Sequence, residues 1–150
     1  MYALFYVLFI TLAMHMAATA MRFTATLDAI ASGASAFWVG AMLACISLGP
    51  MLFAVSAGRW LDRSGPSSPL LTARIGMILA GLSVILLPAK TYGMVSLFAA
   101  ALLTGFSFML TNVVIQRLTG DVSTSKNRRF AFTALSLTTA SSNLAAPVIA

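Results

Sequence analysis

Long apolar runs separated by short charged segments dominate the chain. Five stretches of at least 15 residues contain no Lys, Arg, Asp or Glu: residues 1–21, 29–58, 75–89, 91–116 and 130–150. A membrane-spanning helix needs about 20 mostly apolar residues, whereas a membrane β-barrel strand alternates polar and apolar positions. The pattern therefore predicts five membrane helices, at about residues 2–21, 36–58, 71–89, 93–116 and 130–150.

The first apolar run has a second interpretation. The sequence Ala18-Thr19-Ala20 resembles the cleavage site of a secretory signal peptide. However, this run begins without Lys or Arg, and it is longer than the apolar core of roughly 7–15 residues that signal peptides carry. We therefore expect the segment to be retained as the first membrane helix.

The composition excludes a soluble domain. Hydrophobic residues make up 60% of the chain and charged residues only 8%, against about 25% charged residues in soluble proteins. The single cysteine, Cys45, excludes a disulfide framework and a cysteine-based zinc site. The net charge of +6 comes from basic residues that flank apolar runs, so we expect a lipid bilayer, and no nucleic acid, as the partner. The predicted fold class is an all-α, polytopic membrane helix bundle.

Basic residues are distributed unevenly between the predicted connections. Two lie in or beside the first and third connections, Arg22 and Lys90, and Asp28 is also assigned to the first. Seven lie in or beside the second and fourth connections: Arg59, Arg63, Arg74, Arg117, Lys126, Arg128 and Arg129. Cytoplasmic loops of membrane proteins carry an excess of Lys and Arg. The sequence thus predicts a multi-pass protein of the cell membrane, with connections 59–70 and 117–129 and the N-terminus in the cytoplasm.

The segment from Gly58 to Gly65, which follows the second predicted helix, combines small and charged residues. Gly58 and Asp62 are four positions apart and share one helix face, where a glycine lets another helix approach closely. A carboxylate near a bilayer needs a partner, either the N-terminus of a neighbouring helix or an arginine. Arg63 is expected to project to the cytosol, and Gly65 with the following proline is expected to end the helix.

This segment resembles the cytoplasmic loop signature of the major facilitator superfamily (MFS), G-x-x-x-D-R-x-G followed by two basic residues. Gly58, Asp62, Arg63 and Gly65 match, whereas Pro66 and Ser67 replace the basic pair. The resemblance implies that residues 1–150 form an incomplete N-terminal transmembrane domain, the first five of twelve helices. It further implies a secondary transporter that carries a small solute by alternating access, with the remaining helices as partners and without a cofactor.

Four polar side chains within the predicted spans are candidates for a substrate or proton path: His15, Asn112, Gln116 and Asn143. Polar residues inside a membrane are rare and often mark such pathways. They can equally form hydrogen bonds between neighbouring helices, and the sequence leaves both interpretations open.

Small residues recur at a spacing of four in most spans, which favours close packing of membrane helices. Such sets are Ala13 and Ala17; Gly40 and Ala44; Gly76 and Ala80; Ala101 and Gly105; and Ala134, Thr138, Ser142 and Ala146.

No catalytic set is visible in the sequence. The only histidine, the only cysteine and three separated aspartates provide no metal cluster, no carboxylate pair and no nucleophile with a base. We therefore expect neither an enzyme nor a metal site. The alternative to a transporter is a small, non-transporting polytopic protein, such as an assembly or interaction subunit. The apolar end at Val148-Ile149-Ala150 favours a partial transporter, because helices normally close with polar or glycine signals.

Overall fold

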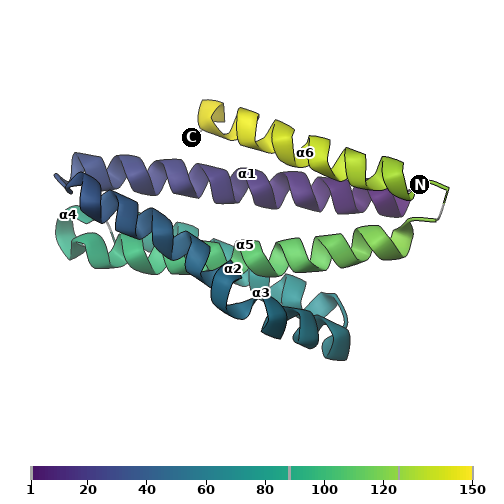
Figure 1. The fold of residues 1–150 in the computed structure, drawn as a ribbon. Coiled ribbons are helices and arrows are strands. Elements are labelled where there is room, and N and C mark those ends of the chain that lie inside the picture. The colour runs from purple at the N-terminus through teal and green to yellow at the C-terminus, as the bar shows by residue number, and fades with distance from the viewer. Residues whose placement is uncertain (1, 88, 125, 150) are drawn as a thin grey trace.

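The computed structural model describes residues 2–87, 89–124 and 126–149, without the side chains of residues 2, 89, 90 and 146–149. The described chain is almost entirely helical (Figure 1), which confirms the predicted all-α class. The helices are α1 (Tyr2–Ala31), α2 (Ala36–Ser64), α3 (Ser67–Leu86), α4 (Ala89–Tyr92), α5 (Met94–Val122) and α6 (Arg128–Ile149).

Four helices are long and apolar enough to cross a membrane: α1, α2, α3 and α5. The length and apolar composition of these four helices indicate a membrane protein. Within the described residues, α6 falls short in hydropathy, although its 22 residues would extend about 33 Å. Its hydroxyl groups donate to carbonyls three or four residues earlier in the same helix, from Ser136, Thr138, Thr139, Ser141 and Ser142. Spanning by this fifth segment therefore stays a prediction.

Helix α1 is longer than its apolar run. It continues ten residues beyond the predicted end at residue 21. Arg22 and Asp28 therefore lie inside the helix, and their predicted position in the first loop is wrong. A charge-free run marks the part of a helix that suits hydrocarbon. The backbone hydrogen bonds of the helix continue past that part into the headgroup region.

The same reason explains why the second and fourth connections, at the other end of the helices, are shorter than the predicted loops 59–70 and 117–129. Helix α2 extends to Ser64 and α5 to Val122, so much of the two predicted loops is helical. The turn after α2 was predicted correctly: Gly65 has a φ of 72°, and its N–H donates to the Leu61 carbonyl. This left-handed conformation is one that glycine adopts without strain.

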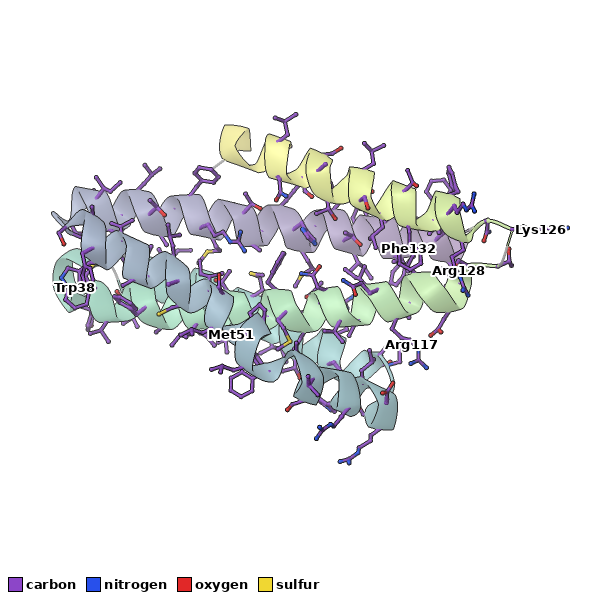
Figure 2. The ribbon with its side chains drawn as sticks, in the orientation of Figure 1. Trp38, Met51, Arg117, Lys126, Arg128 and Phe132 are labelled. Atoms are coloured by element: carbon purple, nitrogen blue, oxygen red, sulfur yellow. The ribbon has the colours of Figure 1, made fainter. Side chains whose placement is uncertain are left out.

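Helix α5 occupies the centre of the bundle. It packs mainly against α3, α2 and α1, whereas α6 packs mainly against α1 (Figure 1). Because of this up-and-down order, the start of α1, the ends of α2 and α5, and the starts of α3 and α6 lie at one end of the molecule. Figure 2 shows Arg117, Lys126 and Arg128 at this end and Trp38 at the other. The seven basic residues of the second and fourth connections therefore gather at one end.

Glycines permit the closest helix contacts. At the crossing of α2 and α5, a Cβ added to Gly49 would lie 3.0 Å from the carbonyl carbon of Gly105, and one added to Gly105 would overlap Ile46. Gly76 of α3 meets Ser107 of α5 in a similar way. These contacts confirm packing at Gly76 and Gly105. The expected packing at Gly40 is wrong, since a Cβ there would meet nothing within 4 Å.

The small-residue stripe of α6 faces α1 in part. Ser142 is fully buried, and Ala134 and Thr138 are partly buried. The side chain of Ala146, the fourth predicted member, lies outside the described residues. The stripe therefore supplies one contact surface of α6, against its main neighbour α1.

Candidate functional site

A cavity of about 440 Å³ lies between α1, α5 and α6. All four polar residues singled out in the sequence line it: His15, Asn112, Gln116 and Asn143. The remaining lining residues are Thr11, Ile115, Leu135, Ser136, Thr139 and Ala140. The cavity exists because α6 rests on α1 and contacts α5 far less, which leaves the polar faces of α5 and α6 apart.

His15 forms the link between α1 and α5. Its side chain is buried, and its Nε2 lies 3.1 Å from the Asn112 Oδ1. With this oxygen as the acceptor, the imidazole Nε2–H is the donor. The ring also meets Phe108 edge-on, with 4.7 Å between the ring centroids. One hydrogen bond and one aromatic contact therefore fix the orientation of the imidazole at the cavity wall.

Two amides complete the polar lining. The hydroxyl of Thr19, one turn beyond His15 on α1, donates to Asn143 Oδ1 of α6 at 3.1 Å. Gln116 lies one turn beyond Asn112 on α5, and among the described residues it makes no side-chain hydrogen bond. Helices α1, α5 and α6 thus each contribute an imidazole or an amide to a single space. Such groups can bind a polar solute by donating and accepting hydrogen bonds.

The acidic residue of the predicted loop motif pairs with an arginine. Asp62 Oδ1 lies 3.0 Å from Arg117 Nη1, and Arg117 Nε lies 3.2 Å from Asp121 Oδ2. The arginine alternative is therefore the one observed for Asp62. This contact ties the end of α2 to the end of α5. The side chains of Asp62 and Arg117 are 65% and 55% exposed, so water screens the pair strongly.

The other three residues of the motif are Gly58, Arg63 and Gly65, and each has different surroundings. Among the described residues no helix approaches Gly58 closely, because a Cβ there would meet nothing within 4 Å, so the close approach expected at this glycine stays a prediction. Helix α2 buries Ala57 and Leu61 instead, so the contact face lies beside the glycine. Arg63 is exposed as expected, and Gly65 ends the helix.

From the sequence, Arg117 and Arg22 are only basic residues of the connections, and their contacts with Asp62 and Phe108 were not predicted. Arg117 is four positions before Asp121, a spacing that places the two side chains on one helix face and is a readable signal. The Arg22 guanidinium lies over the Phe108 ring, with Cζ 5.3 Å from the centroid. Arg22 also continues a series of polar residues on α1 at spacings of three or four: Thr11, His15, Thr19, Arg22 and Thr26.

Within the described ranges, no group of three His, Cys, Asp or Glu side chains could hold a metal ion. Comparison of the chain with family models, with curated proteins and with solved structures gives no match.

Proposed function

We propose that residues 1–150 belong to the N-terminal half of an MFS-type secondary transporter, which carries a small solute across the cell membrane by alternating access. The observation that carries this proposal is the convergence of His15, Asn112, Gln116 and Asn143 on one cavity between three helices. Polar groups in an apolar bundle are costly, and their gathering around an open space is typical of a pathway for a polar solute.

The depth of the cavity supports a solute site. His15 lies within the charge-free run of α1, residues 1–21, about 6 Å along the axis from the middle of that run. Secondary transporters hold their substrates near the bilayer midplane, between helices that move relative to one another.

The pair of Asp62 and Arg117 supports a gating role at the basic end. Exposed ion pairs of this kind contribute about 0.2–1 kcal/mol, so the contact can break and form again within a transport cycle. It joins the end of α2 to the end of α5, and α5 also carries two cavity residues. The gathering of seven basic residues at the same end supports a cytoplasmic position for this end and for the N-terminus.

The experiment uses the complete reading frame that contains these residues, reconstituted into proteoliposomes. Counterflow of labelled carboxylates, amino acids and sugars identifies the transported class. We expect saturable, gradient-driven flux that His15→Leu and Asn112→Leu abolish. The matched control is Ser141→Ala, because this hydroxyl is exposed and bonds to the Leu137 carbonyl of its own helix.

Correctly inserted protein without saturable flux of any of these solutes would refute transport. It would favour the alternative of a membrane-embedded assembly or interaction subunit. Flux that survives both substitutions would instead refute the assignment of the site.

A further inference from the structure

Arg22 directly follows the charge-free run of α1, about 10 Å along the axis beyond His15. Its Nε is buried within the bundle. Asp28, on the same helix, lies about 9 Å further along the axis, and six residues rotate it by about 240° around the helix. A buried guanidinium nitrogen requires a hydrogen-bond partner, and its charge favours an anion.

Neither ion pair between described residues includes Arg22, since both belong to Arg117. The chain contains only three acidic residues. Asp62 and Asp121 are held at the basic end of the bundle, and Asp28 points around the helix from Arg22. Within the described chain, the partner of Arg22 is the face of Phe108. An aromatic face attracts a cation but leaves the N–H donors of a guanidinium available for an anion.

Phe108 connects Arg22 to the cavity. The centroid of its ring is 4.7 Å from the centroid of the His15 ring and 5.3 Å from the Arg22 Cζ. The guanidinium carbon is therefore no further from the centre of the imidazole than the sum of these two distances. Helical side chains lean toward the N-terminus of their helix. On α1 this direction leads from Arg22 toward Thr19 and His15. The side chain is therefore directed toward the cavity, although Arg22 is not one of the residues that line it.

Arg22 carries a buried polar atom without a hydrogen-bond partner. Its Nε is one of four such side-chain atoms among the described residues, and the other three are hydroxyl oxygens of α5, of Thr104, Ser107 and Thr119. The Ser107 hydroxyl faces Gly76 of α3. Buried polar groups in proteins are nearly always satisfied. An unpaired guanidinium nitrogen close to His15 therefore points to a ligand that accepts hydrogen bonds.

We propose that Arg22 binds the oxyanion of the transported solute, a carboxylate or a phosphate. A guanidinium binds either group through two parallel hydrogen bonds. The imidazole and amides of the cavity bind the rest of the molecule, and no carboxylate among the cavity-lining residues repels it. The inference rests on the proposed transport function for calling this ligand a substrate.

The test measures binding of radiolabelled succinate and inorganic phosphate to the purified chain in phosphatidylcholine nanodiscs by equilibrium dialysis. We expect saturable binding of at least one of these anions. Unlabelled anions should displace it, whereas choline and glucose should not. This competition uses the unaltered chain and so does not depend on the folding of any variant.

The variants separate Arg22 from other basic residues. Arg22→Gln should weaken anion binding about tenfold or more, and Arg22→Lys should weaken it less, because lysine keeps the charge but not the paired hydrogen bonds. The control Arg74→Gln removes an exposed arginine and should leave binding unchanged. Equal binding by Arg22→Gln, displacement by choline, or no saturable binding of either anion overturns the proposal.

A lipid phosphate is the other source of the same chemistry. If a headgroup occupies Arg22, the anions should bind in phosphate-free maltoside micelles and fail to bind in the nanodiscs, and that result would overturn a solute site. The two proposals can also fail separately. Anion binding at Arg22 without flux by the complete reading frame refutes transport alone. Saturable flux of neutral or cationic solutes without anion binding refutes the oxyanion site alone.

Discussion

Substituting Gly105 by alanine tests the packing that positions the central helix. Gly105 lies where α5 crosses α2, and an added Cβ would overlap the Ile46 carbonyl oxygen and lie 2.8 Å from its carbonyl carbon. These atoms are backbone, so no side-chain rotation relieves the overlap. Helices α2 and α5 must move apart, and with them the contact of Gly49 against Gly105 and Phe106 is lost.

The magnitude follows from two opposing effects. Overpacking a close contact costs about 1–3 kcal/mol, whereas replacing glycine by alanine inside a helix contributes about 0.5–1 kcal/mol of stability. The matched control Gly81→Ala, in the interior of α3, receives only the second effect, because a Cβ there would meet nothing within 4 Å. The difference between the two variants should therefore be about 1–3 kcal/mol, with Gly105→Ala the less stable.

The assay is reversible unfolding of the purified chain in maltoside micelles by increasing amounts of dodecyl sulfate, followed by far-ultraviolet circular dichroism. Extrapolated free energies of unfolding are compared for the two variants and the unaltered chain. A difference below about 0.5 kcal/mol, as surface substitutions usually give, would refute the close crossing of α2 and α5 at Gly105.

Three further predictions concern the site and its orientation. Asp62→Asn should change the free energy of unfolding by less than about 1 kcal/mol, because the ion pair is exposed. In the complete reading frame it should slow transport more than it weakens substrate binding, and lost affinity with an unchanged maximal rate would contradict a gating contact. His15→Leu should destabilise the chain by about 0.5–2 kcal/mol by removing an interhelical hydrogen bond, and His15→Gln should lose less; equal losses would exclude that bond. Cysteines at Ser67 and Ser123 should resist impermeant reagents added to intact cells, and ready labelling of both would reverse the orientation.

Much of the fold was predictable because hydrocarbon imposes one simple rule on a spanning segment. A segment in hydrocarbon must satisfy its own backbone and remain apolar for about 20 residues, so charge-free runs locate the helices. The rule does not fix the helix ends. Beyond the hydrocarbon, a helix continues as long as its sequence permits, which is why Arg22 and Asp28 lie within α1.

The cavity residues were identifiable one at a time but not as a group. His15, Asn112, Gln116 and Asn143 each stand out as polar in an apolar run. Their convergence depends on α6 packing on α1 and on the distance between α5 and α6, which no local pattern encodes. The neighbour of Gly58 was unpredictable for a related reason: the spacing of residues gives the face of a helix but not the helix that packs against it, and no described helix approaches this glycine.

Helix α5 joins the two parts of the proposed mechanism. Along one rigid helix it carries Gly105 against α2, Asn112 bonded to His15, and Arg117 bonded to Asp62. Asn112 and Arg117 are separated by about 7.5 Å along the axis. A rigid-body displacement of α5 would therefore shift Asn112 together with Arg117, because the intervening helix is hydrogen-bonded throughout. The reverse order is also consistent with this geometry. A solute that competes with His15 for Asn112 would weaken one of the contacts that hold α5 in place. In the proposed mechanism, gating and solute binding thus act on the position of the same helix, which is the physical requirement for coupling between two sites.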